Sequence, residues 1–184
     1  MAAIASLCVF CGSQTGRNPA HAEAARSLGT ALAQRGITLV YGAGGIGHHR
    51  HQADAVLAGG GEVVGVIPEH LARLEVAHEG LTETVVTEDM FRRKQIMIDR
   101  SDGFIVLPGG YGTLDEFFEV LTWKQLGLHD KPVIVLDTEG FWTPLLALVD
   151  HVSADGFAPP AAPGLATVVR STEELFRVLE NGEA

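Results

Sequence analysis

Short apolar runs alternate with stretches of helical periodicity along the whole chain. Six runs have the length and composition of buried strands, at residues 4–10, 37–41, 63–67, 84–86, 104–107 and 133–136. Helical patterns fill the gaps, for example at 20–34 and 113–126, and glycines follow both of these segments at positions 36 and 127. Strands joined by helices pair in parallel, because the helix returns the chain to the same edge of the sheet. We therefore predict an α/β fold, a doubly wound, mostly parallel, Rossmann-like sheet with helices on both faces.

Composition limits the number of domains and the kinds of partner. The 184 residues are 46% hydrophobic and 20% charged, which suits one domain with a buried core, and no linker or repeat divides residues 1–184. The net charge of −10 argues against nucleic-acid binding, which usually needs a basic surface. No apolar run approaches the roughly 20 residues that span a bilayer, and the first residues lack the features of a signal peptide. We expect a single cytoplasmic domain with no nucleic-acid or membrane partner.

The two cysteines form a C-x-x-C pattern. Such a pair is typical of redox sites and of half of a zinc site. Cys8 falls inside a predicted strand rather than at a helix start, and no second pair of cysteines follows Cys11. We interpret both thiols as structural and expect no metal site.

A glycine-rich turn follows the predicted strand at 104–107. Residues 108–116 read P-G-G-Y-G-T-L-D-E, so the strand leads into a turn that opens a helix. Glycines allow close approach of a ligand to the backbone, and the first N–H groups of the helix attract anions such as phosphate. Glu116 falls about one turn inside this helix, where a carboxylate can stabilise positive charge on a reacting sugar carbon. The pattern indicates an enzyme that acts on a nucleotide.

Ligands of doubly wound sheets bind at the carboxyl ends of the strands. We therefore expect the turns after Phe10, Tyr41, Ile67 and Leu107 to meet. The turn at 42–47 reads G-A-G-G-I-G, a G-x-G-x-x-G pattern. This turn fits a mononucleotide-facing loop, a dinucleotide site or a purely structural connection, although the acid expected after a dinucleotide fingerprint is missing from the end of the next strand.

The segment 87–97 has the pattern of a helix start, with Thr87 as its expected cap. Arg93 and Lys94 share one face with Met90 and Met97, which predicts that Arg93 faces the interior. Alternatively, Arg93 and Lys94 lie on a charged helix face, with their aliphatic stems along the surface and their charged ends in solvent.

Three histidines lie in the segment 48–51, which reads H-H-R-H at the start of the second predicted helix. This cluster has three interpretations: a metal site, a histidine that faces the substrate or donates a proton to it, and a group of solvated side chains. A metal site is disfavoured because no acid or thiol accompanies the histidines in the sequence.

Taken together, these motifs resemble the LONELY GUY (LOG) family of cytokinin riboside 5′-monophosphate phosphoribohydrolases, which are often mislabelled lysine decarboxylases. The 108–116 loop fits the family's P-G-G-x-G-T-x-x-E, the segments 121–132 and 9–13 fit its flanking motifs, and Arg93-Lys94 fits its M-H-x-R-K. The resemblance covers nearly the whole chain. It implies a homodimer that cleaves the N-glycosidic bond of N6-modified adenosine monophosphates, and of AMP, without a cofactor.

The family's functional residues fall on matching positions of this sequence. Arg93 and Glu116 match the catalytic pair. The positions that match substrate-binding residues are Glu75, Arg93, Lys94, Gly109, Gly110, Tyr111, Gly112, Thr113, Glu116 and Thr122.

Two departures from the family pattern bear on substrate preference or rate. The family's G-G-G-x-x-G-L-M-G is G-A-G-G-I-G-H-H-R at residues 42–50, and the histidine of M-H-x-R-K is Phe91. Because Arg93, Lys94 and Glu116 are kept, we expect the activity class to be kept as well. The alternative function is a nucleotide-binding module or sensor without turnover, and a dinucleotide oxidoreductase is a third hypothesis.

Overall fold

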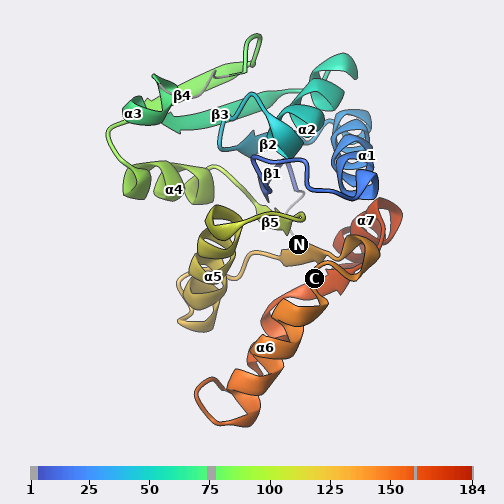
Figure 1. Cartoon of the computed structure of the whole chain (residues 1–184), viewed down its shortest axis with the longest axis vertical. Helices are drawn as coiled ribbons and strands as arrows, with labels where there is room; N and C mark the ends of the chain where they lie inside the picture. Colours follow the sequence, from blue (N-terminus) through green and yellow to red (C-terminus); the bar gives the residue numbers. More distant parts are fainter. Residues whose placement is uncertain (1–3, 74–77, 160, 184) are drawn as a thin grey trace.

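The computed structural model describes residues 4–73, 78–159 and 161–183 and contains one seven-stranded sheet (Figure 1). The strand order is β4-β3-β2-β1-β5-β6-β7, and every neighbouring pair is parallel. The strands are β1 (Ser6–Phe10), β2 (Thr38–Tyr41), β3 (Val63–Pro68), β4 (Glu83–Thr87), β5 (Gly103–Val106), β6 (Val133–Leu136) and β7 (Thr167–Val169). The order reverses between β1 and β5, which confirms the predicted doubly wound α/β fold.

The helices cover both faces of the sheet. They are α1 (Pro19–Arg35), α2 (Gly47–Ala58), α3 (Glu69–Ala72), α4 (Met90–Asp99), α5 (Tyr111–Gln125), α6 (Thr143–Ala154) and α7 (Thr172–Asn181), with short 3₁₀ turns at Thr138–Gly140 and Ala162–Leu165. One apolar core packs the sheet against α1, α2 and α7, and the other packs it against α4 and α5. Figure 1 shows these two groups on opposite sides, with α6 extending away from the sheet.

Alternate side chains of β1 point to opposite faces of the sheet and so enter the two different cores. Leu7 and Val9 lie in the core with α1 and α2, whereas Cys8 and Phe10 lie in the core with α4 and α5. Both cysteine thiols are free and buried, and burial raises their pKa well above the usual value, which agrees with a structural role for the pair.

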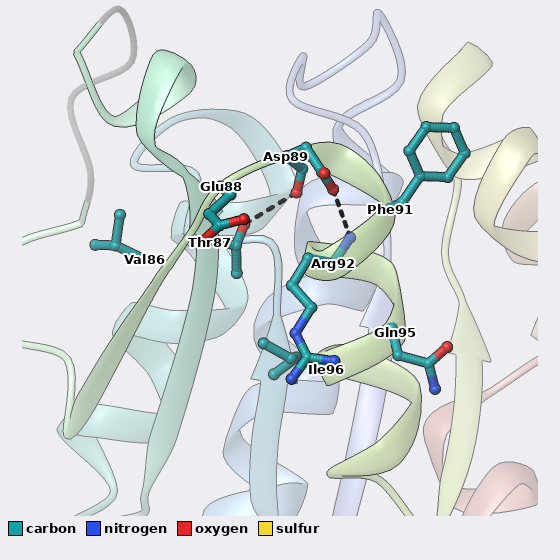
Figure 2. A pocket seen from close by; sticks show the side chains of 8 residues that line it. All are labelled: Val86, Thr87, Glu88, Asp89, Phe91, Arg92, Gln95 and Ile96. Carbon is teal, nitrogen blue, oxygen red and sulfur yellow. Dashed lines mark hydrogen bonds between the residues drawn. The ribbon is translucent and has the colours of Figure 1, made fainter.

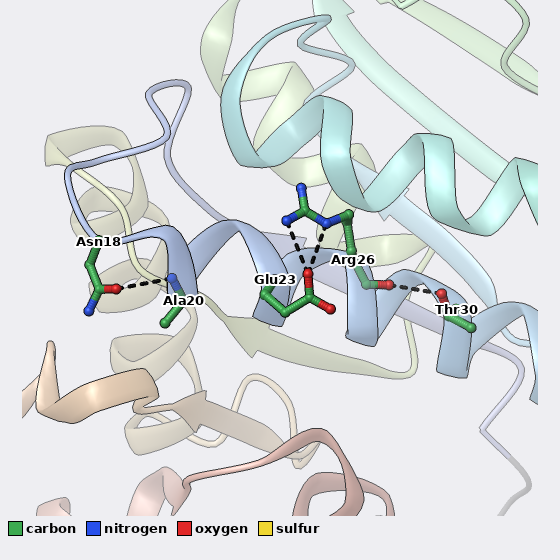
Figure 3. A network of polar contacts seen from close by, with 5 residues as sticks. All are labelled: Asn18, Ala20, Glu23, Arg26 and Thr30. Carbon is green, nitrogen blue, oxygen red and sulfur yellow. Dashed lines mark hydrogen bonds and ion pairs between the residues drawn. The ribbon is translucent and has the colours of Figure 1, made fainter.

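Local signals in the sequence fix the ends of α1. The Asn18 side chain accepts a hydrogen bond from the N–H of Ala20 at 3.0 Å (Figure 3). At the other end, Gly36 terminates the helix with a φ of 63°. Within the helix, Arg26 donates two hydrogen bonds to Glu23, at 3.1 and 3.0 Å, and its carbonyl accepts one from Thr30. These contacts stabilise the helix that packs along α2.

Close packing of α1 on α2 requires a glycine. A Cβ atom at Gly29 would overlap the backbone carbonyl of Gln52 on α2. The two helices therefore approach at backbone distance, and this contact holds the first turn of α2 near the end of β1.

All six predicted strands are present, and β7 was missed. It has three residues between a proline-rich loop and α7, so its sequence pattern is too short to distinguish it from a loop. The last helix, α7, has a local cap, since Ser171 accepts a hydrogen bond from the N–H of Glu174 at 3.1 Å.

The predicted cap of α4 was wrong. Thr87 is the last residue of β4, and its hydroxyl donates to the carbonyl of Asp89 at 3.1 Å. The N-cap is Asp89, whose carboxylate accepts from the N–H of Arg92 at 2.8 Å (Figure 2). The β-branched Thr87 pairs with Pro68 in the sheet, so strand pairing shifts the helix start by two residues.

Candidate active site

A cavity of about 230 Å³ lies at the point where the strand order reverses. Its walls come from the turns after β1, β2 and β5, from α3 and α4, and from the first turns of α5. The lining residues are Cys11, Gly12, Ser13, Gly42, Gly44, His49, Leu71, Arg93, Gly110, Tyr111, Gly112, Thr113 and Glu116. The expected meeting of the turns after Phe10, Tyr41, Ile67 and Leu107 is confirmed.

Arg93 reaches this cavity from α4 and is held by backbone carbonyls. Its Nε donates to the carbonyl of Val66 at 3.1 Å, and its Nη2 donates to the carbonyl of Gly42 at 3.1 Å. The residue is 9% exposed, which confirms that it faces the interior. A Cβ atom at Gly42 would overlap the guanidinium, so that glycine makes room for the arginine. Arg93 is a fixed cation with further N–H groups free to bind a ligand.

Glu116 faces the same cavity from α5. Only 8% of the residue is exposed, and the charged group that favours its ionised form most is the Arg93 guanidinium. Burial raises the pKa of Glu116 to about 7, against the opposing effect of the Arg93 guanidinium. Near neutral pH this carboxyl is therefore divided between its protonated and ionised forms, the condition in which a carboxyl works as an acid or a base.

The N-terminus of α5 opens into the cavity. Gly110 is the N-cap, and the N–H groups of Tyr111, Gly112 and Thr113 occupy the first turn, where a helix offers donors without intrahelical partners. Tyr111 is 93% exposed, so its ring leaves the backbone of this turn accessible. This geometry suits a phosphate group.

The other residues predicted to bind substrate lie in different places. Lys94 does not line the cavity, because its ammonium pairs with Asp115 and Glu119, each at 3.1 Å. Burial alone lowers the pKa of Lys94, but the hydrogen bonds that its ammonium donates to these carboxylates raise it overall. Gly109 lines a neighbouring cavity, and Thr122 is exposed on α5 outside the lining. Glu75 lies outside the described residues. Binding roles for these residues stay predictions.

The histidine cluster divides between two cavities. His49 lines the cavity with Arg93 and Glu116, whereas His48 lines a neighbouring cavity of about 250 Å³ together with His21 and Phe141. Burial lowers the pKa of His48 to about 4 and that of His49 to about 3. Both rings are neutral near neutral pH, and neither is part of a solvated cluster.

Arg50 supports a chain of polar contacts beside the site. Its Nε donates to the Asp54 carboxylate at 3.2 Å, and the same carboxylate contacts Nε2 of His78 at 2.7 Å. The N–H of His78 donates to the carbonyl of Ala43 at 3.3 Å, in the turn that lines the cavity. Burial raises the pKa of Asp54, but the hydrogen bonds from His78 and Arg50 outweigh burial and lower it. These contacts join α2 to the segment after β3.

A wide hollow of about 550 Å³ lies on the outer surface, between β4 and α4 (Figure 2). Val86 and Phe91 line it and are 58% and 80% exposed. The Phe91 ring points away from the helix in Figure 2, so this departure from the family motif does not change the cavity that holds Arg93.

Sequence reasoning missed Leu71 as a lining residue and left the role of His49 open. Leu71 belongs to the four-residue helix α3, which has no periodic pattern to mark it. The rule that strand ends meet was the available signal, since α3 directly follows β3.

Over the described ranges, no cluster of three or more His, Cys, Asp or Glu side chains has a geometry that holds a metal ion. In the same part of the chain, none of the helices has the combination of length and hydrophobicity needed to cross a bilayer.

The fold and the site define a doubly wound α/β protein with a buried glutamate and arginine beside the N-terminus of a helix. Residues 50–179 match the family model described as "Possible lysine decarboxylase". The chain is 46% identical to the cytokinin riboside 5′-monophosphate phosphoribohydrolase LOG1 of Arabidopsis thaliana, over 95% of this chain and 82% of that one. It is 44% identical to the enzyme of the same name from Rhodococcoides fascians, over 91% and 85% of the two chains. The chain therefore belongs to the LOG family.

Solved structures with the same fold are more distant in sequence. The molybdenum cofactor binding protein from Rippkaea orientalis has a TM-score of 0.72 at 20% identity, over the full length of both chains. The Moco carrier protein from Chlamydomonas reinhardtii has a TM-score of 0.73 at 19% identity, over 96% and 95% of the two chains. At these identities the likeness shows the fold alone.

Proposed function

We propose that this protein hydrolyses the N-glycosidic bond of N6-modified adenosine monophosphates, and of AMP, to a free base and ribose 5-phosphate. The observation that carries the proposal is the placement of buried Glu116 and Arg93 in one cavity with the N-terminus of α5. The names of relatives at 44–46% identity support the substrate class.

The 5′-phosphate binds at the first turn of α5, where the N–H groups of Tyr111, Gly112 and Thr113 act as donors. Glu116 follows Thr113 by three residues, so a ribose bound beside this turn lies next to the carboxyl group. In this pose the remaining N–H groups of Arg93 bind the nucleotide from the opposite wall.

Glycosidic cleavage passes through an oxocarbenium-like state at C1′. The C1′–N9 bond breaks and its electron pair goes to the base, while a water oxygen bonds to C1′. Water loses one proton and the base gains one, so protons balance overall. Ionised Glu116 stabilises the positive charge at C1′, and burial strengthens this interaction because little water screens it.

We also propose that the protein is a cytoplasmic homodimer. The exposed apolar side chains Val86 and Phe91 on β4 and α4 support an interface between copies, and the free thiols of Cys8 and Cys11 fit a reducing compartment. Sedimentation of the wild type and of Phe91→Ser tests the first point, since a monomer in both would contradict it.

The function is tested by chromatography of isopentenyladenosine monophosphate and of AMP after incubation with the wild type and with Glu116→Ala. We expect free base from the wild type and a loss of at least a hundredfold in the variant. Tight binding without any product from the wild type would instead identify a nucleotide-binding module.

A further inference from the structure

His49 lines the cavity from the first turn of α2, the helix that follows β2, whereas the proposed phosphate position lies at the start of α5, the helix that follows β5. In the sheet, β1 separates β2 and β3 from β5, so the two helices that follow β2 and β3, α2 with His49 and α3 with Leu71, start on the other side of β1 from the N-terminus of α5. A nucleotide with its phosphate on α5 extends across the turn after β1 toward these two residues. This pose rests on the proposed function, and it places the base beside His49.

The protein holds the His49 ring in a defined position. The ring centroids of His49 and Tyr41 are 5.8 Å apart, with an interplanar angle of 39°. On another side the turn after β2 packs against the imidazole, because a Cβ atom at Gly44 would lie 3.2 Å from its Cγ. The imidazole is therefore wedged between an aromatic ring and the backbone.

The ring is neutral and has unused hydrogen-bonding capacity. Burial, the Arg93 guanidinium and His48 lower the pKa of His49 to about 3, so the imidazole carries one N–H and one lone pair in the ordinary pH range. The Nδ1 atom is buried, and none of the described residues hydrogen-bonds to it. A proton on Nε2 avoids an unpaired buried N–H at Nδ1 and leaves the Nε2 proton available as a donor.

We propose that His49 is a catalytic residue that donates a hydrogen bond to a ring nitrogen of the departing purine. As the C1′–N9 bond breaks, its electron pair passes to the purine, and negative charge spreads over the ring nitrogens. A donor at this place binds the transition state more strongly than the bound substrate. His49 keeps its own proton, and the proton that the base finally gains comes from water.

Kinetics separate this role from packing. The variants are His49→Met, which has an apolar side chain of similar length, and His49→Gln, which restores a donor. We expect His49→Met to lower kcat by about tenfold to a hundredfold with KM nearly unchanged, and His49→Gln to recover part of the loss. The matched control is His151→Gln on α6, where the side chain is 67% exposed, and it should leave the rate unchanged.

A spectroscopic measurement tests the contact itself. The imidazole ¹⁵N resonances of His49 are followed in Glu116→Gln, which we expect to bind nucleotide without turnover, and they are assigned by comparison with the same variant carrying His49→Met. We expect AMP to shift the His49 resonances and ribose 5-phosphate, which lacks a base, to leave them in place.

The two proposals fail separately. Wild-type turnover combined with equal rates for His49→Met and with unshifted His49 resonances would overturn the role of His49 and leave the proposed function standing. A shift with AMP alone, in a protein that releases no base, would keep the contact with the purine and overturn both turnover and the catalytic role.

Discussion

Burial of the Glu116 carboxyl group makes the stability of the fold depend on pH. Folding raises its pKa from 4.5 to about 7, so the folded state binds this proton more tightly than the unfolded state does. The stabilisation from the bound proton is complete below the unfolded pKa and is lost as the pH rises through about 7. This rise in pKa corresponds to a loss of about 3 kcal/mol of stability at high pH, most of which falls between about pH 5 and about pH 8.5.

Replacement of Glu116 by Gln removes this titration and keeps the shape of the side chain. Relative to the wild type, we expect Glu116→Gln to gain about 2–3 kcal/mol of unfolding free energy between about pH 5 and about pH 8.5. Urea denaturation of both proteins at both pH values measures this gain. Any constant cost of burying the amide cancels in the comparison, and so do the contributions of all other titrating groups.

The matched control is Glu88→Gln, which changes an exposed carboxylate. Its unfolding free energy, relative to the wild type, should be the same at both pH values. If Glu116→Gln also showed no change with pH, the carboxyl of Glu116 would be solvated in the folded protein, and its buried position in the cavity would be refuted.

Three further predictions concern the same cavity. The value of kcat/KM should rise with pH through about 7 as Glu116 ionises, and a flat profile over this range would contradict a role for the ionised carboxylate. Gly42→Ala should displace the Arg93 guanidinium and lower kcat/KM at least about tenfold, whereas Gly164→Ala, where a Cβ meets open space, serves as the neutral control. Arg93→Met should lower the unfolding free energy by about 2–4 kcal/mol in urea denaturation, because the carbonyls of Val66 and Gly42 lose their donor; unchanged stability would show that these two hydrogen bonds contribute little.

The fold was predictable because its signals are local and repeated. The strands β1, β3 and β6 are largely apolar runs, and the crossover helix α1 carries both a cap at Asn18 and a stop at Gly36. The strand order and the meeting of the turns then follow from the rules for parallel sheets. β7 escaped prediction because its three residues are defined by pairing with β6.

The site was predictable where the positions of its residues are fixed within a single segment of the sequence. The glycine-rich turn and Glu116 are contiguous, and the register of α4 turned Arg93 inward. The partners of Lys94 and the position of His49 depend on contacts between segments far apart in the sequence. Asp115 is 21 residues from Lys94 along the chain, and no sequence pattern in either segment predicts that these two side chains form an ion pair.

The central claim is that a 5′-phosphate on α5 places C1′ beside Glu116. The most direct test compares AMP with adenosine, which lacks the phosphate, as substrates of the wild type, with base and ribose 5-phosphate quantified separately. The account predicts equal amounts of base and ribose 5-phosphate from AMP, and a value of kcat/KM for adenosine lower by at least about a hundredfold. Equal cleavage of adenosine, or release of inorganic phosphate in place of base, would contradict it.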